Sequence, residues 1–156
     1  MSVRRSVVAL SGCVLLLIAA GAPAGEKKID RSELPPAVEK TVAAQGPGAT
    51  VRGLSREEEK GRVLYEAELS IGGRSRDILI DATGAIVEAE EEVSIESLSP
   101  EVQAGLKARA GKGAITKVES ITKGGRLVGY EAQVDTHGKR SEISVGPEGK
   151  PLGRGK

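Results

Sequence analysis

Residues 61–81, GRVLYEAELSIGGRSRDILID, decide which fold this sequence predicts. Before the glycine pair Gly72-Gly73 the residues alternate, so that Tyr65 and every second residue after it face one way. Glu66 and Glu68 then face the other way. Paired glycines are typical of a tight hairpin turn, and the run RSRDILID after them alternates again. The stretch therefore predicts a β-hairpin with one apolar face and one polar face.

The same pattern returns 64 to 65 residues later in the chain. Apolar anchors and turn glycines coincide in constant order, which is the sequence signature of an internal repeat. The matched pairs are Leu34 with Leu98, Pro36 with Pro100, Val38 with Val102, Val42 with Leu106, Tyr65 with Tyr130, Gly73 with Gly138, Ile78 with Ile143, Ile80 with Val145 and Gly84 with Gly149.

Each copy predicts a short helix followed by about four strands. In the second copy Ser99 is a good N-cap, and Pro100 suits the first helical position. Helices this short are marginal alone, so we expect each to pack on one face of its sheet. The expected fold class is α+β, with two repeats of a short helix packed on an antiparallel sheet of about four strands. We place the repeats at residues 25–95 and 96–156, the second with a frayed C-terminal tail.

The start of the chain has the features of an export signal. Arg4 and Arg5 precede an apolar run that ends in the small residues Ala22-Pro23-Ala24. The run is too short and too interrupted for a membrane span of about 20 residues. We expect a signal peptide over residues 1–24 and a periplasmic or extracellular protein. An uncleaved anchor, or a lipoprotein anchored through Cys13, is the alternative.

The composition of the exported part excludes several classes of protein. It contains no cysteine, so no disulfide can form, and Tyr65 and Tyr130 are its only aromatic residues. Both tyrosines alternate with apolar residues, and we expect them in the core. Loss of the leader removes two arginines and no acid, which changes the formal charge from +1 to −1. A nearly neutral chain without exposed aromatic residues is not expected to bind nucleic acid.

No arrangement of residues predicts catalysis. Nucleophilic catalysis needs a base beside the nucleophile, and the only histidine, His137, lies in a predicted turn. The acidic run Glu88–Glu92 could attract calcium or a basic partner, but it lacks the loop spacing of a calcium site. We interpret it as a solvated strand end and linker. The sequence therefore predicts no enzyme, no cofactor and no metal site.

The hairpin residues resemble a PepSY-type module. The resemblance lies in Tyr65-Glu66-Ala67, the glycine turn, the second strand to Asp81 and the exit Thr83-Gly84-Ala85. Residues from Tyr130 to Gly149 repeat the pattern less completely, with Gly146 where Asp81 stands. The tandem arrangement is similar to that of PepSY-like, β-lactamase-inhibitor-like exported proteins, over roughly residues 34–152.

The resemblance implies export and a binding or inhibitory role without catalysis. We expect a protein or peptide partner in the cell envelope, and modulation of a hydrolase or protease is one role of this kind. The alternative is a structural, self-associating envelope protein. The candidate partner surface is the polar sheet face, carrying Glu66, Glu68, Glu131 and Gln133. It offers no aromatic anchors of the kind on which tight interfaces rely, which argues against tight inhibition of a β-lactamase.

Overall fold

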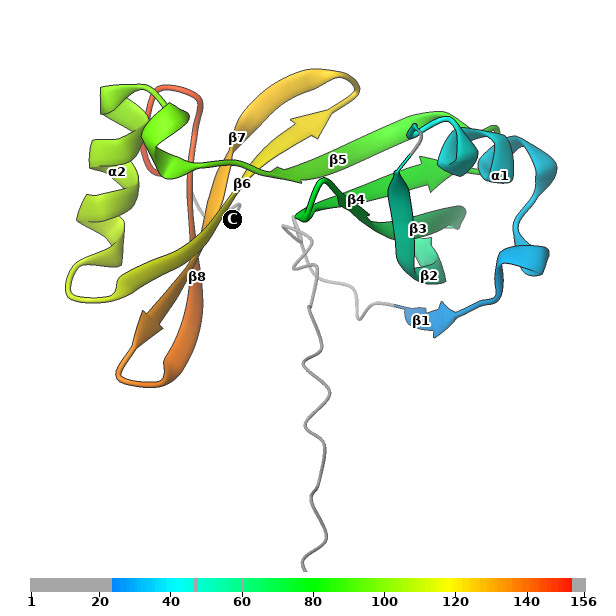
Figure 1. Cartoon of the computed structure of the whole chain (residues 1–156), viewed down its shortest axis with the longest axis horizontal. Coiled ribbons are helices and arrows are strands. Elements are labelled where there is room, and N and C mark those ends of the chain that lie inside the picture. The colour runs from blue at the N-terminus through cyan, green and yellow to red at the C-terminus, as the bar shows by residue number, and fades with distance from the viewer. Residues whose placement is uncertain (1–23, 47, 60, 153–156) are drawn as a thin grey trace, which may run out of the picture.

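Eight antiparallel strands form one sheet in a computed structural model, which describes residues 24–46, 48–59 and 61–152. Each strand pairs with its neighbours in the sequence, so the sheet is a continuous meander (Figure 1). The strands are β1 (Ala24–Lys28), β2 (Ala49–Glu59), β3 (Arg62–Ile71), β4 (Arg74–Asp81), β5 (Ile86–Glu92), β6 (Ala114–Lys123), β7 (Arg126–Thr136) and β8 (Lys139–Val145).

The expected fold class, α+β with two repeats that each have a separate sheet of about four strands, is wrong. The finding that overturns it is the pairing of β5 with β6, from Glu88 opposite Lys123 to Glu92 opposite Glu119. The backbone N–H and C=O groups along a strand edge need hydrogen-bond partners, and here the edges of β5 and β6 supply them to each other. The run Glu88–Glu92 is therefore an internal strand and not a linker, and the chain is one mainly β sheet with two short helices.

Two α-helices, α1 (Pro36–Ala43) and α2 (Pro100–Ala110), lie toward opposite ends of the sheet (Figure 1). Each follows a single 3₁₀ turn, η1 (Arg31–Glu33) or η2 (Ile95–Ser97). The predicted N-cap of α2 is confirmed, because the Val102 N–H donates to Ser99 Oγ at 3.3 Å.

Each helix covers its own buried hydrophobic cluster. The first comprises Leu34, Val38, Val42, Tyr65, Ala67, Leu69, Ile78, Ile80 and Ala89, and the second Val102, Leu106, Val118, Ala132 and Val145. Alternation along the paired strands places the strand residues of both clusters on one face of the sheet. The predicted core positions of the tyrosines are confirmed: Tyr65 is buried, and the half-buried Tyr130 packs against the second cluster.

The predicted leader and Cys13 lie outside the described residues, except that Ala24 is the first residue of β1. The end of the predicted frayed tail, residues 153–156, also lies outside them. Within the described part of the chain, neither helix is long and apolar enough to cross a membrane.

Candidate partner-binding surface

The sheet face opposite the helices carries the residues that the sequence selected. Glu66 and Glu68 alternate with the core residues of β3, and Glu131 and Gln133 alternate with those of β7. All four therefore point away from the helices. Glu131 is buried and the other three are half-buried, so this face is more enclosed than the solvated surface expected from the sequence. The two pairs are not adjacent, because β4, β5 and β6 lie between them.

Three acidic residues that the sequence analysis did not select fill this space. Asp77 on β4, Glu90 on β5 and Glu119 on β6 each bring a carboxylate oxygen within 4.8 Å of the others. Glu90 is 7% exposed and Glu119 is 6% exposed. We call these three residues the junction cluster, since they lie where β5 and β6 join the two parts of the sheet.

A lysine and a serine contact the junction cluster directly. Lys117 Nζ lies 2.6 Å from Glu119 Oε1, and the Ser75 hydroxyl donates to the same oxygen at 3.3 Å. Ser75 also donates its backbone N–H to Glu92 Oε2 at 3.0 Å. Lys117 and Ser75 thus supply partners for Glu119 Oε1 from within the protein.

Further acids extend the cluster across the sheet from β3 to β8. We call eight of the acids on this side of the sheet the acidic face, with Glu66 beside them on β3: Glu68, Asp77, Glu88, Glu90, Glu92, Glu119, Glu131 and Glu142. Two ammonium groups pair with it, Lys117 with Glu119 and Lys123 Nζ with Glu88 Oε2 at 3.1 Å. These eight carboxyl groups outnumber the two ammonium groups that pair with them, on a chain whose formal charge is close to zero.

Burial and mutual repulsion raise the pKa values of three of these acids well above the ordinary range. Burial, followed by the charges of Glu119 and Glu131, raises the pKa of Glu90 to about 8. Burial, with Glu142 as the largest neighbouring charge, raises the pKa of Glu131 to about 7. The pKa of Asp77 rises to about 6 for the same two reasons, although Lys117 opposes the rise. Glu90, Glu131 and Asp77 therefore exchange protons near neutral pH, where isolated carboxyl groups are already ionised.

The spacing of the junction cluster would also suit a cation bridging three carboxylates. Lys117 is half-buried and already brings an ammonium group to Glu119 at 2.6 Å. Since this side chain supplies positive charge from within the protein, we assign no metal to the cluster.

His137 occupies the turn between β7 and β8, as the sequence predicted. It is exposed and has a φ angle of 56°, next to Gly138. The turn lies beyond the ends of the two strands, whereas the junction cluster lies within the sheet.

Comparisons with solved structures show a shared fold. A BLIP-like protein of Bacteroides fragilis NCTC 9343 matches with a TM-score of 0.55 and 21% identity, over 77% of this chain and 84% of that chain. A DUF2874 family protein of Bacteroides uniformis ATCC 8492 gives 0.59 and 16% identity, over 76% of this chain and 86% of that chain. A Bacteroides eggerthii DSM 20697 protein thought to be periplasmic gives 0.60 and 16%, over the same two shares.

The chain has a BLIP-like fold. At these identities the likeness concerns the fold alone, and it confirms the β-lactamase-inhibitor-like part of the predicted resemblance at that level. The PepSY part of the resemblance stays a prediction. No model of a known protein family matches the chain, and no curated protein matches it.

Proposed function

We propose that this chain is an exported, non-catalytic protein that binds a partner protein or peptide in the cell envelope and thereby modulates a hydrolase or protease. The observation that carries the proposal is the acidic face, a set of acidic side chains from six neighbouring strands on the side of the sheet opposite both helices. Export is supported by the leader-like residues 1–24 and by the fold shared with a protein thought to be periplasmic. The absence of catalysis is supported by the position of His137 in an exposed turn.

The charge of the acidic face indicates the chemistry of the partner. Eight carboxyl groups from six strands meet two lysines, so a segment rich in lysine or arginine complements the face. Such charges speed association, and at physiological ionic strength they act over about 8 Å. We therefore expect modest affinity that falls as salt is added.

The alternative of self-association has less support. Two copies stacked on their acidic faces would bring like charges together. Pairing through the sheet edges is opposed by charged side chains, Lys27 and Lys28 on β1 and Lys139 and Arg140 on β8.

Site-specific photo-crosslinking tests the proposal. A photo-reactive amino acid replaces Gln133, which is half-buried on the acidic face, and in a matched control it replaces Lys107, which is exposed on α2. Both proteins are irradiated in envelope extract of the source organism. We expect one heterologous protein to crosslink from position 133 only, in a saturable manner, and with lower yield when salt is added.

The identified partner is then purified and mixed with the unmodified chain. Its hydrolytic activity should change at a stoichiometric ratio of the two proteins. Equal crosslinking from both positions, crosslinking only between copies of this chain, or a partner whose bound segment lacks lysine and arginine would overturn the proposal.

A further inference from the structure

At the junction of β5 with β6, charged and polar side chains outnumber apolar ones on both faces of the sheet. The buried Ile121, opposite Glu90 on the acidic side, belongs to neither hydrophobic cluster. Strand β5 gives Ala89 to the first hydrophobic cluster, and Val93, just after β5, packs against the second. Between them the chain carries only acids, Glu90, Glu91 and Glu92. Neither hydrophobic cluster therefore spans the junction, among the residues that the structure describes.

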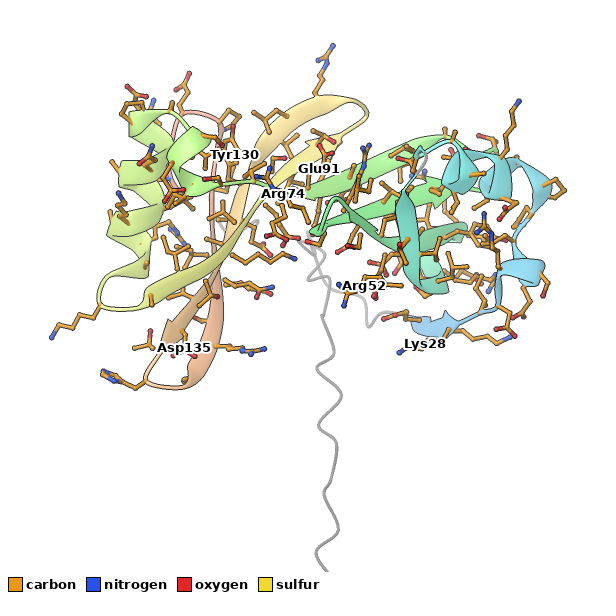
Figure 2. The ribbon with its side chains drawn as sticks, viewed as in Figure 1. Lys28, Arg52, Arg74, Glu91, Tyr130 and Asp135 are labelled. Atoms are coloured by element: carbon orange, nitrogen blue, oxygen red, sulfur yellow. The ribbon has the colours of Figure 1, made fainter. Side chains whose placement is uncertain are left out.

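On the helix side of the sheet, an ion pair occupies the junction. Arg76 Nη1 on β4 lies 3.2 Å from Glu91 Oε1 on β5, and Glu91 is exposed. Figure 2 shows Glu91 and Arg74 near the waist of the molecule, between the two parts that carry the helices. A partly exposed ion pair of this kind contributes little to stability.

On the opposite side the junction cluster takes its members from β4, β5 and β6. Charged groups face Glu90 from every strand around it: Glu68 on β3, Asp77 on β4, Glu88 and Glu92 on β5, Lys117, Glu119 and Lys123 on β6, Glu131 on β7 and Glu142 on β8. The carboxylate oxygens of the three residues lie within 4.8 Å of one another, so protonation of one of them removes part of their mutual repulsion. Once ionised, they repel one another in a buried setting that water screens poorly.

We propose that the β5–β6 junction is a proton-operated joint, tight while Glu90 is protonated and looser when Glu90 and Asp77 are both ionised beside Glu119. The raised pKa values of Glu90, Glu131 and Asp77 support a transition close to neutral pH. The β5–β6 backbone pairing holds the two parts together in both states. Loosening changes the angle between the parts and thus the shape of the acidic face.

The consequence for binding rests on the proposed function, whereas the joint itself does not. If the acidic face binds a cationic segment, the charge that attracts this segment and the shape that receives it change together as pH rises. If the crosslinking experiment fails, the proposed partner is wrong and the proposed joint still stands. If the two parts of the sheet do not move with pH, the joint is wrong and the proposed partner still stands.

Distance measurements between spin labels on the two helices test the joint. Cysteines replace Ala43 on α1 and Lys107 on α2, both exposed, in a chain in which serine replaces Cys13 if the leader is retained. Pulsed electron spin resonance then gives the distance distribution at about pH 5 and about pH 9, on either side of the transition. We expect a shifted and broader distribution at the higher pH, reversible on returning to the lower one.

Two variants separate the junction cluster from general effects of pH. Glu90→Gln with Glu119→Gln removes two of the three ionisable groups, and Glu90→Gln alone serves if the double variant does not fold. Either should make the distribution nearly independent of pH. The matched control, Glu96→Gln with Glu101→Gln, removes two exposed carboxyl groups near α2 and should keep the full response. An identical distribution at both pH values, or an unchanged response in the Glu90 variants, would overturn the proposal.

Discussion

The two ends of the sheet hold their helices by different contacts. At the first end the Thr41 hydroxyl on α1 donates to the carbonyl oxygen of Gly84 at 2.6 Å. At the second end α2 and the turn at Gly149 touch through their backbones, and a Cβ atom on Gly105 would lie 2.0 Å from the Gly149 oxygen. The first junction of helix and turn thus adds a side-chain hydrogen bond, whereas the second has the closer backbone packing.

The turns themselves follow the same division. In the first, Asp81 Oδ1 accepts from the Thr83 N–H at 2.9 Å and from the Ala85 N–H at 3.1 Å. In the second, Gly146 replaces the aspartate, so this side-chain acceptor is lost. The backbone bond is common to both turns, from the Asp81 N–H to the Ala85 carbonyl at 2.9 Å and from the Gly146 N–H to the Lys150 carbonyl at 2.7 Å. The first end should therefore tolerate added volume better, and the second end should tolerate the loss of polar side chains better.

The largest effect is expected from Gly149→Ala. The new Cβ would lie 2.1 Å from the Glu101 carbonyl oxygen, and the φ angle of +75° is itself unfavourable for alanine. Strain and overpacking together should lower the free energy of unfolding by about 3–5 kcal/mol, measured by urea denaturation. Gly138→Ala is the control for strain alone, because its φ is +83° and its new Cβ would meet nothing within 4 Å.

The first end offers the matched comparison for this prediction. In Gly84→Ala the Cβ would lie 2.7 Å from the Ala37 carbonyl oxygen, so the clash is milder at a similar φ of +87°. We expect a loss between those of Gly138→Ala and Gly149→Ala. Equal losses of unfolding free energy in Gly84→Ala and Gly149→Ala would mean that the second end accommodates a new Cβ atom as easily as the first. The contrast between the two ends would then be wrong.

The tyrosines provide the next comparison. Tyr65 is 9% exposed within the first cluster, whereas Tyr130 is only half-buried against the second. Tyr65→Ala should cost about 3–4 kcal/mol, the scale of a large core truncation, and Tyr130→Ala about half as much. Thermal and urea unfolding of both variants measures the difference. A larger loss at Tyr130 would show that the second cluster depends more on its aromatic residue than its exposure indicates.

A third prediction concerns the junction between the two ends. Because the folded-state pKa of Glu90 is about 8 against an ordinary 4.5, the folded chain binds more protons than the unfolded chain between these values. Stability from this group is complete below about pH 4.5 and is lost as pH rises through about 8. Glu90→Gln cannot ionise, so it should be more stable than the parent chain by about 2–3 kcal/mol above pH 8.

The same pair of proteins should differ little near pH 5, where Glu90 is protonated in the folded state. Urea denaturation across this pH range measures both limits, and Glu26→Gln, at an exposed position, is the control. A constant difference between Glu90→Gln and the parent at all pH values would show that Glu90 does not titrate as its surroundings require.

Local patterns in the sequence predicted the local structure well. Alternation around Tyr65 gave the hairpin, its turn at Gly72-Gly73 and the buried face, because strand period and turn geometry are set by neighbouring residues. The N-cap of α2 at Ser99 and the buried positions of both helices followed from the same kind of evidence, whereas α1 ends before Gly46 and its N-cap, Pro35, makes no side-chain hydrogen bond. The polar character of the opposite sheet face was also evident, since Glu66 and Glu68 alternate with core residues.

The joining of the strands into one sheet could not be read in the same way. The pairing of Glu88–Glu92 with β6 connects segments about 30 residues apart, and nothing in the run itself indicates with which strand it pairs. Its charge indicated a linker, whereas burial of Glu90 depends on neighbours from β4, β6 and β7. The one available signal was that Glu88, Glu90 and Glu92 alternate, which would suit a strand with an acidic face.

The smallest effect is expected from Thr41→Val at the first end. The substitution keeps the branched shape but removes the donor to the half-buried Gly84 carbonyl, at a cost of about 1–2 kcal/mol. Thr41→Ser keeps the hydroxyl and should lose much less, so urea denaturation of the two variants separates the hydrogen bond from the packing. A stable Thr41→Val protein would mean that helix α1 rests on its apolar face alone. The reciprocal change Gly105→Thr cannot create the same bond at the second end, because its Cβ would already lie 2.0 Å from the Gly149 oxygen. The two contacts are therefore alternatives that single substitutions cannot interchange.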